Sequence, residues 1–221
     1  MAAVAALNPQ PGERVLDLCA APGGKSTQLA GRMRGQGLLV SNEPVPKRAA
    51  ILARNMERMG VMNALTVSAL PDVLAARWPE AFDAVLVDAP CSGEGMFRRH
   101  PETRAEWTAD SPAGCAKRQR EILESAAKLV RPGGRLTYAT CTLNPTENEE
   151  NMAWFVETHP DFELSPFALP GLGSCEGAMT LYPHRIRGEG HFVALLRRKG
   201  EAECTVVPFS GLKEADKTAA K

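Results

Sequence analysis

The stretch Arg14-Val15-Leu16-Asp17-Leu18-Cys19-Ala20-Ala21-Pro22-Gly23-Gly24-Lys25 decides the fold of this chain. Its first six residues form a short apolar run typical of a buried strand, and a glycine-rich turn leads from them into a helical pattern over residues 25–33. A strand, a tight glycine loop and a helix in this order predict the first unit of an α/β fold. In such folds the loop after the strand lies at the edge of the sheet where ligands bind.

Strand and helix patterns alternate along the rest of the chain. Apolar runs predict further strands at residues 38–42, 65–67, 82–87, 135–141, 162–164 and 190–197. Residues at helical spacing predict a helix after the second strand: Val45, Ala49, Leu52, Met56 and Met59. A second stripe predicts a helix that the segment Pro132-Gly133-Gly134 ends: Gln119, Ile122, Ala126 and Val130. Thr146 and Glu149 have the spacing of a capping box for a further helix.

This alternation predicts right-handed crossovers and a mostly parallel sheet with helices on both faces. A length of 221 residues suits one such domain. We expect residues 1–198 to form that domain, and residues 199–221, rich in Lys, Glu and Ala, to form a polar tail or linker.

The composition excludes several classes of protein. Hydrophobic residues make up 44% and charged residues 24%, which is typical of a globular domain, and the apolar runs are too short for a membrane span. The N-terminus lacks the pattern of a signal peptide. Six cysteines without a C-x-x-C pair argue against a disulfide framework and a zinc site, so we expect a cytoplasmic protein. A net charge of zero excludes a polycation that binds nucleic acid by bulk charge.

Polar and thiol side chains follow several of the predicted strands: Asp17 with Cys19, Asn42 with Glu43, Asp88 with Cys91, and Cys141. Because the carboxyl ends of parallel strands meet at one edge of a sheet, we expect one ligand site there. Three other cysteines fit small buried or inert loop residues: Cys115, Cys175 and Cys204.

The glycine loop resembles two nucleotide-binding motifs without matching either. Gly23-Gly24-Lys25-Ser26-Thr27 imitates the end of a phosphate-binding loop, but Cys19 stands where that motif needs glycine. The G-x-G-x-x-G pattern of dinucleotide folds is absent as well. A ligand without pyrophosphate, such as S-adenosylmethionine, fits better. Glu43 follows the second strand, where an acid would bind the ribose hydroxyls.

Cys91 and Cys141 suggest covalent chemistry, because each follows a strand at the expected ligand edge. Carbon 5 of cytosine is a poor nucleophile until a thiolate adds to carbon 6 and pushes electron density onto it. Asp88 can hydrogen-bond or protonate ring nitrogen 3 as the adduct forms, and the second thiol can assist release. The spacing leaves open which thiol attacks.

Three blocks closely resemble the Nop/Sun family of RNA cytosine-5 methyltransferases: residues 15–25, Asp88-Ala89-Pro90-Cys91-Ser92-Gly93, and Thr140-Cys141-Thr142. The resemblance covers about residues 8–198. Residues 94–99 and 184–192 look like the bacterial ribosomal RNA branch of the RsmF type. It implies a class I S-adenosylmethionine-dependent methyltransferase, with a Rossmann-like, mostly parallel seven-stranded sheet. The implied substrate is a cytidine in RNA, most simply ribosomal RNA.

The resemblance also implies roles for individual residues. Cys141 is the expected nucleophile, Cys91 assists product release, and Asp88 acts on the ring. The expected cofactor-binding residues are Cys19, Ala20, Ala21, Pro22, Gly23, Gly24, Lys25, Glu43, Arg48 and Asp88. Lys25 could neutralise charge at the loop or hold Asp88. Arg98, Arg99, Arg185, Arg187 and His191 are expected to contact RNA phosphates.

The chain also departs from the family pattern. Members of the family carry RNA-binding regions outside the catalytic domain, and we expect this chain to lack them. Ser68-Ala69 stand where an Asp or Asn often lies near the adenine, and His100 replaces an acidic residue. Three alternatives remain open: the same chemistry on transfer RNA, a non-catalytic RNA-binding assembly factor, and a phosphate-loop hydrolase.

Overall fold

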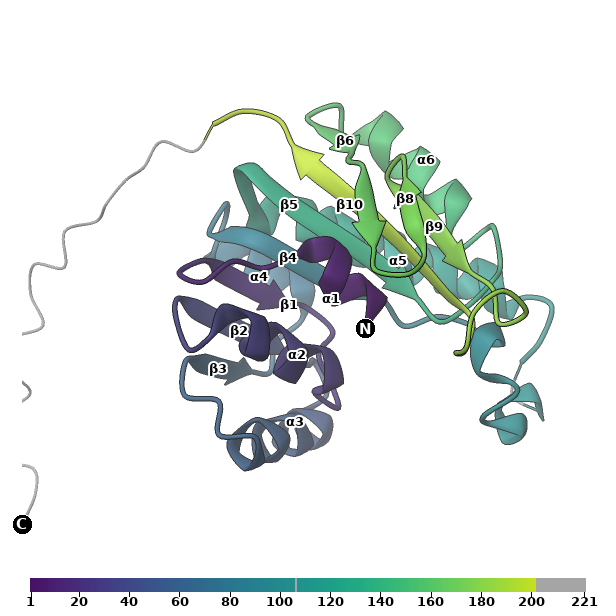
Figure 1. Ribbon diagram of the computed structural model, residues 1–221, viewed down its shortest axis with the longest axis horizontal. Helices are drawn as coiled ribbons and strands as arrows, with labels where there is room; N and C mark the ends of the chain where they lie inside the picture. Colours follow the sequence, from purple (N-terminus) through teal and green to yellow (C-terminus); the bar gives the residue numbers. More distant parts are fainter. Residues whose placement is uncertain (106, 202–221) are drawn as a thin grey trace, which may run out of the picture.

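A computed structural model describes residues 1–105 and 107–201 of the chain. Its central sheet consists of β1 (Arg14–Asp17), β2 (Leu38–Asn42), β3 (Ala64–Val67), β4 (Phe82–Asp88), β5 (Val130–Thr140), β6 (Phe162–Leu164), β9 (Ala178–Leu181) and β10 (His191–Arg198). The strand order is β3-β2-β1-β4-β5-β10-β6, and β9 pairs with β10 as well (Figure 1). The five strands from β3 to β5 are parallel, while β10 is antiparallel to β5, β6 and β9.

The mostly parallel α/β sheet predicted from the sequence is therefore confirmed. The seven predicted strands are the seven that follow one another across this sheet. The sequence did not predict β9 or a separate small sheet of β7 (Phe167–Leu169) and β8 (Gly173–Cys175). These strands have three or four residues each, too few to show an alternating pattern.

The helices are α1 (Ala2–Leu7), α2 (Gly24–Met33), α3 (Pro46–Arg58), α4 (Pro71–Arg77), α5 (Ser111–Leu129) and α6 (Glu149–Thr158). The sequence did not predict α1 and α4. These helices have six and seven residues, too few for apolar residues to recur at helical spacing. Val45 and Met59 were expected within the stripe of α3, but both lie just outside the helix and are exposed. Val130 belongs to β5 and not to the helix before it.

Two further local predictions are wrong. The segment Pro132-Gly133-Gly134 does not separate a helix from a strand, because β5 begins before it and the pairing with β4 shifts register there. Thr146 and Glu149 do not form a capping box. Asn148 precedes the first turn of α6, and the Glu149 carboxylate instead accepts a hydrogen bond from Thr180 at 3.0 Å.

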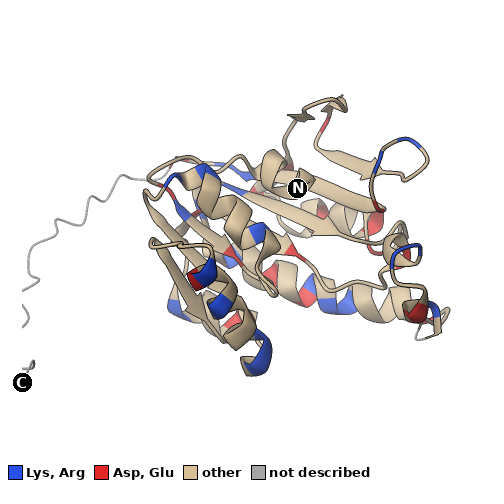
Figure 2. Cartoon of the chain, turned by 60° about the horizontal axis from the view of Figure 1, so that its bottom comes forward, with Lys and Arg blue, Asp and Glu red and all other residues tan. Residues whose placement is uncertain are grey.

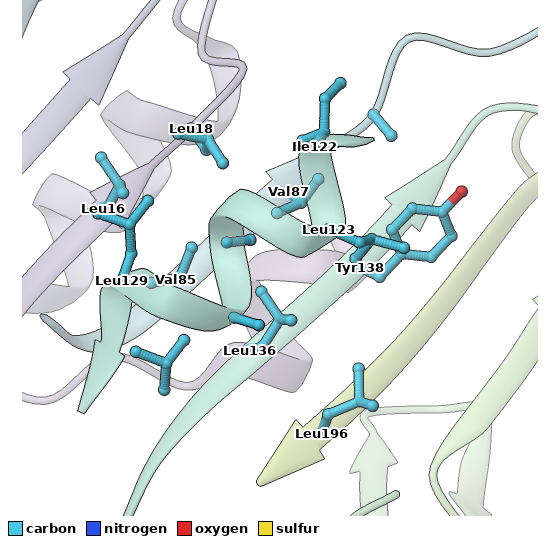
Figure 3. Close-up of a cluster of buried hydrophobic side chains, with 14 of the residues drawn as sticks. Leu16, Leu18, Val85, Val87, Ile122, Leu123, Leu129, Leu136, Tyr138 and Leu196 are labelled. Atoms are coloured by element: carbon cyan, nitrogen blue, oxygen red, sulfur yellow. The ribbon is translucent and has the colours of Figure 1, made fainter. Parts of the chain in front are cut away.

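Each face of the sheet packs against its own layer of helices. Alternate strand residues such as Leu16, Val85 and Leu136 join a core with α5, which contributes Leu123 and Leu129 (Figure 3). The intervening strand residues face the other way and pack with α1, α2 and α3: Val15, Leu39, Ala84 and Leu86. Because successive side chains of a strand point to opposite faces, one strand supplies both cores.

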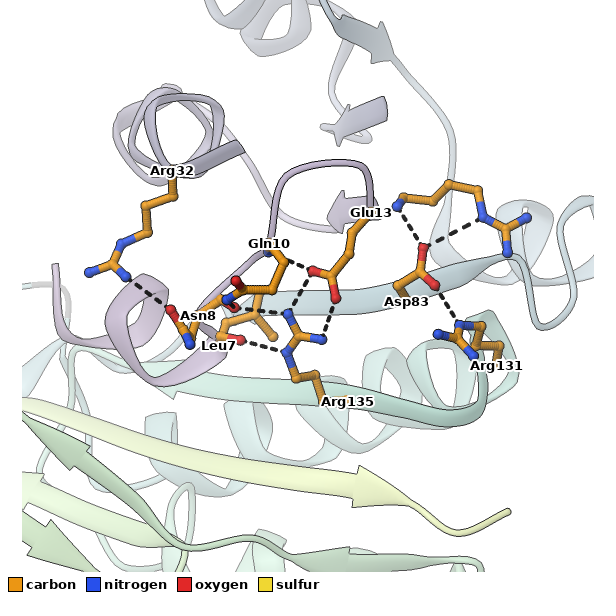
Figure 4. A network of polar contacts seen from close by, with 9 residues as sticks. Leu7, Asn8, Gln10, Glu13, Arg32, Asp83, Arg131 and Arg135 are labelled. Atoms are coloured by element: carbon orange, nitrogen blue, oxygen red, sulfur yellow. Dashed lines mark hydrogen bonds and ion pairs between the residues drawn. The ribbon is translucent and has the colours of Figure 1, made fainter. Parts of the chain in front are cut away.

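Polar contacts anchor the edge of the sheet where β1 and β4 begin (Figure 4). The Arg135 guanidinium donates to the Leu7 carbonyl at 2.6 Å and to the Glu13 carboxylate at 2.7 and 2.8 Å, which ties α1 to β5. Asp83, a polar residue in an otherwise apolar strand, accepts from Arg131 and from the backbone of Arg14. These contacts tie together the elements at the N-terminal ends of β1 and β4. The polar residues predicted to bind ligand lie at the opposite, carboxyl-terminal ends of the parallel strands.

No helix in residues 1–105 and 107–201 is long and apolar enough to cross a membrane. The expected polar tail at 199–221 lies mostly outside the described residues, as does Cys204. Lys199 is described, and it contacts Pro160 and the backbone of Asp161.

Candidate active site

The loop between β1 and α2 forms the first wall of the candidate site. Gly23 has a φ of 111°, which favours glycine, and its carbonyl accepts the Thr27 backbone N–H as α2 begins. A side chain at Gly23 would also lie 3.0 Å from Leu52 of α3. The loop therefore needs glycine at this position both for its backbone conformation and for its packing on α3.

Asn42, at the end of β2, holds neighbouring loops together. Its side-chain amide donates to the carbonyls of Leu18 and Ala69 at 3.1 and 3.0 Å, and its side-chain oxygen accepts the Ala69 N–H at 3.1 Å. The loops after β1 and β3 are thus fixed to the end of β2. The backbone of Ala69 participates, so the departure at Ser68-Ala69 leaves this connection intact.

Glu43 lies where the sequence predicts a ribose-binding acid. Its side chain is 2% exposed, one oxygen accepts the Val45 N–H at 3.0 Å, and the other lies 3.3 Å from the Arg48 guanidinium. Arg48 also reaches the Ala21 carbonyl at 3.3 Å. Glu43 and Arg48 therefore connect the end of β2 with the glycine loop.

Lys25 forms an ion pair with Asp88, with Nζ 2.5 Å from a carboxylate oxygen. The sequence left two roles open for this lysine, and the structure supports the one in which it holds Asp88. Both side chains are partly buried, which strengthens their attraction relative to a pair in water. The Asp88 carboxylate at the end of β4 is thereby fixed beside the loop.

The two thiols predicted at the ligand edge lie against each other. Cys91 Sγ and Cys141 Sγ are 3.1 Å apart, and the Cys141 N–H points to Cys91 Sγ at 3.3 Å. The hydrogen bond from Cys91 lowers the pKa of the Cys141 thiol. The same contact, together with burial, raises the pKa of Cys91. The pair is therefore asymmetric: the pKa of Cys141 is shifted down and that of Cys91 is shifted up, so Cys141 is the more acidic of the two thiols.

A buried polar cluster, which the sequence did not predict, supports the loop that carries Cys91. One oxygen of the Glu147 carboxylate accepts the Ser92 N–H at 3.0 Å and the Gln119 amide at 2.7 Å. The same Gln119 amide donates to the Pro90 carbonyl at 2.9 Å. Buried polar groups of this kind fix a backbone conformation when they are paired. Gln119 had been predicted only as part of a helical stripe.

Two short 3₁₀ helices, η1 (Glu94–Met96) and η2 (Pro101–Ala105), occupy the long loop after β4. The Gly95 N–H donates to the Cys141 carbonyl at 2.9 Å, and the Gly190 N–H donates to the Gly95 carbonyl at 3.3 Å. A Cβ at Gly95 would lie within 2.7 Å of the carbonyl oxygens of both partners, so only glycine permits this approach. The loops around the two thiols are therefore packed backbone to backbone.

These elements enclose a cavity of about 950 Å³. The predicted site residues that line it are Cys19, Ala21, Lys25, Glu43, Arg48, Asp88, Cys91 and Cys141. Four others shape the loop without lining the cavity: Ala20, Pro22, Gly23 and Gly24. Further lining residues come from α4, from Leu70 just before it, and from α5, where the sequence predicted no site: Leu70, Pro71, Asp72, Arg118, Glu121, Ile122 and Ser125. The volume is large for one small ligand and suits a cofactor together with a second group.

Asp17 lies fully buried at the end of β1, next to the glycine loop. One carboxylate oxygen accepts the Ser26 hydroxyl at 2.7 Å, and the other has no hydrogen-bond partner among the described residues. Burial raises the pKa of Asp17 to about 7. A buried acid with an unpaired oxygen, a buried ribose-type acid at Glu43 and a close glycine backbone fit S-adenosylmethionine, whose charged amino acid end needs such partners.

The basic residues expected to contact RNA do not form one continuous patch. Lys and Arg are spread over several elements with Asp and Glu between them (Figure 2). Arg99 and His191 line the cavity, whereas Arg185 stacks over Tyr182 at 5.7 Å. Arg98 donates to the Gly188 carbonyl at 2.8 Å.

The sheet order, the loop after β1 and the buried acid after β2 define the class I fold of S-adenosylmethionine-dependent methyltransferases. Within this class, residues 4–197 match the family model for the 16S rRNA methyltransferase RsmB/F. The chain belongs to this family.

Three relatives illustrate the match. Ribosomal RNA small subunit methyltransferase F of Citrobacter koseri is 42% identical over 207 residues, which cover 91% of this chain and 43% of the relative. The crystal structure of PH0851 has a TM-score of 0.82 at 41% identity, covering 89% of this chain and 45% of that one. NSun6 from Pyrococcus horikoshii with SFG has a TM-score of 0.78 at 29% identity, covering 90% and 51%. This chain thus spans about half the length of these relatives.

Proposed function

We propose that this chain transfers a methyl group from S-adenosylmethionine to carbon 5 of a cytidine in ribosomal RNA. The observation that carries the proposal is the contact between Cys91 and Cys141, whose sulfur atoms lie 3.1 Å apart in the cavity that Asp88 and Glu43 also line. The names of the curated relatives support ribosomal RNA as the substrate class. The target position in that RNA and the reaction at carbon 5 belong to the proposal.

The cofactor end of the cavity lies between the glycine loop and β2. S-adenosylmethionine, when bound, supplies an electrophilic methyl group. The Glu43 carboxylate is positioned to accept hydrogen bonds from the ribose hydroxyls, and Arg48 keeps this carboxylate in place. The unpaired oxygen of Asp17 provides an acceptor beneath the loop. These residues bind and orient the cofactor without taking part in bond formation.

The other end of the cavity carries out the chemistry on the base. The Cys141 thiolate adds to ring carbon 6, and the electron pair of the double bond moves toward carbon 5, which becomes nucleophilic. Asp88, which Lys25 contacts at 2.5 Å, takes up a proton for this step and donates it in a hydrogen bond to the ring nitrogen that accumulates negative charge. Carbon 5 is then able to accept the methyl group.

Product release follows from the asymmetry of the thiols. After water in the cavity takes the proton from carbon 5, the electron pair re-forms the ring double bond and the bond between Sγ of Cys141 and carbon 6 breaks. Cys91, protonated and 3.1 Å away, stabilises the departing thiolate by donating a hydrogen bond. Without Cys91 the covalent adduct should persist.

The test is to trap this adduct. Cys91→Ala protein is incubated with S-adenosylmethionine and unmodified ribosomal RNA, and the products are separated on a denaturing gel. We expect a shifted band that nuclease removes and that is absent from the Cys91→Ala/Cys141→Ala variant. Cys175→Ala, which changes a thiol in β8 away from the cavity, serves as the matched control and should give no stable adduct.

Calorimetric titration with S-adenosylmethionine tests cofactor binding separately from the covalent reaction with cytidine. Cofactor binding with no adduct on any RNA would refute covalent cytosine chemistry by this chain while leaving the cofactor site intact. An adduct that persists in the double variant would refute the assignment of Cys141.

A further inference from the structure

Glu189 lies two residues before β10, in the wall of the candidate active site. Its side chain is 20% exposed and lines the same cavity as Cys91 and Cys141. One carboxylate oxygen lies 3.3 Å from the Arg98 guanidinium. The other oxygen, Oε2, is buried and has no hydrogen-bond partner among residues 1–105 and 107–201.

A buried carboxylate oxygen without a partner is costly, and native structures rarely contain one without a reason. Contacts made by the other carboxylate oxygen and by the neighbouring backbone fix the Glu189 carboxylate in place. Arg98 binds both the Glu189 carboxylate and the carbonyl of Gly188 at 2.8 Å. The packing of Gly95 against Gly190 fixes the backbone on the other side. Glu189 is therefore oriented by its neighbours while one acceptor is left free.

The proposed reaction needs a group that distinguishes cytidine from uridine. Addition of a thiolate to carbon 6 is possible on either ring, so the thiols do not provide this distinction. The two bases differ at position 4, where cytosine carries an amino donor and uracil a carbonyl acceptor. A carboxylate accepts a hydrogen bond from the amino group and repels the carbonyl.

The other carboxylates that line the cavity, among the described residues, are less suited to this task. Asp88 is paired with Lys25, and Glu43 is bound to Arg48 and the backbone at the cofactor end. Asp72 and Glu121 are exposed on α4 and α5. Glu189 is next to the thiol end and has a buried, unpaired oxygen.

We propose that Oε2 of Glu189 accepts a hydrogen bond from the 4-amino group of the target cytidine and that Arg98 is the positioning residue for this carboxylate. The inference rests on the proposed methylation of cytidine and specifies how the base is selected. A uridine in the same place would leave its 4-carbonyl facing the carboxylate. Glu189 is thus a specificity residue, and Arg98 acts through it without touching the base.

The experiment compares three substrates that differ at position 4 and, for uridine alone, also in the proton on ring nitrogen 3, so the pair of cytidine and 2-pyrimidinone isolates the 4-amino group. The methylated site is first located in a ribosomal RNA transcript, and short RNAs are then made with cytidine, uridine or 2-pyrimidinone riboside at that site. Single-turnover methyl transfer is measured for the wild-type chain, Glu189→Leu, Glu189→Asp and Arg98→Lys. Glu163→Gln, which alters an exposed carboxylate on β6, is the matched control.

We expect Glu189→Leu, which has no acceptor, to lose about 10- to 100-fold in the single-turnover rate constant on cytidine, as for a lost hydrogen bond to a charged group. The same change should have little effect on 2-pyrimidinone, which lacks the amino group, so the preference of the wild type for cytidine over 2-pyrimidinone should disappear in the variant. Glu189→Asp should keep part of the preference. Arg98→Lys should weaken the preference less than Glu189→Leu, because the carboxylate remains.

Two results would overturn the inference. Wild-type rates of Glu189→Leu on cytidine would show that the carboxylate does not bind the base. Equal losses on cytidine and 2-pyrimidinone would show a purely structural effect. If the wild-type chain binds S-adenosylmethionine but methylates none of the RNAs, the proposed function itself fails and the inference fails with it. That outcome is distinct, because in the first two the wild-type chain remains active on cytidine.

Discussion

The Asp17→Asn variant should become more stable than the wild type as the pH rises. Asp17 is fully buried, and burial raises its pKa to about 7, against the 3.8 of a solvated aspartate. The hydrogen bond from Ser26 opposes this shift, while the nearby charges of Asp88 and Lys25 act in opposite directions. Ionising Asp17 therefore costs more in the folded protein than in the unfolded chain.

The size of the effect follows from linkage. A pKa that rises from 3.8 to about 7 on folding corresponds to about 4 kcal/mol, at about 1.36 kcal/mol for each pH unit. Because the folded pKa is raised, the associated stability is fully present below about pH 4 and is lost as the pH rises through about 7. Roughly 2 to 3 kcal/mol of this loss falls between pH 5 and pH 8. Asparagine does not ionise, and its side-chain oxygen can still accept the Ser26 hydroxyl.

The assay is urea unfolding of both proteins at intervals from pH 5 to pH 8, without cofactor. The free energy of unfolding of Asp17→Asn minus that of the wild type should increase by about 2 to 3 kcal/mol over this range. Taking the difference cancels titrations common to both proteins. Asp110→Asn, which changes an exposed carboxylate before α5, should give a flat difference. A flat difference for Asp17→Asn too would refute the reasoning that this acid is held against ionisation.

Three other predictions concern the site and its support. Cys91→Ala should slow alkylation of Cys141 by iodoacetamide about tenfold at neutral pH, measured by mass spectrometry, because the hydrogen bond that lowers the pKa of Cys141 is lost; an unchanged rate would contradict this cause. Gly95→Ala should lower the free energy of unfolding by more than about 2 kcal/mol, since a Cβ would overlap the Gly190 carbonyl oxygen; wild-type stability in urea would show that the loops give way freely. Tyr138→Phe should cost about 1 to 3 kcal/mol in the same assay, because its hydroxyl donates at 2.7 Å to a buried backbone carbonyl at the start of α6; a neutral substitution would mean that water replaces it.

The sheet and the main residues of the candidate site could be predicted because their signals are local. A buried strand followed by glycines is visible within twelve residues, and the alternation of strands and helices then fixes which ends meet at one edge. Cys91, Cys141, Asp88 and Glu43 all lie at the end of a strand or within three residues of it, so the sheet order was sufficient to bring them together. The structure places all four in one cavity.

The residues that sequence reasoning missed depend on contacts between distant parts of the chain. Glu147 supports the loop around Cys91 from 55 residues away, and Glu189 meets Arg98 across 91. Neither residue lies in a periodic pattern, and each taken alone resembles a surface carboxylate. The part of the cavity lined by α4 was missed for a different reason. This helix has seven residues, too few for a recognisable pattern of apolar residues at helical spacing. Glu147 and Glu189 acquire their positions in the site from the way the chain folds, and their residue type alone does not reveal it.

The order of the two thiols shows how structure adds to what spacing can say. From the sequence, Cys91 and Cys141 are equivalent, because each follows a strand. In the folded chain their sulfur atoms share one contact of 3.1 Å. Their hydrogen bond lowers the pKa of Cys141 and raises that of Cys91, while burial raises the pKa of both. The direction of this difference favours Cys141 as the proposed nucleophile, the assignment that the family resemblance implies.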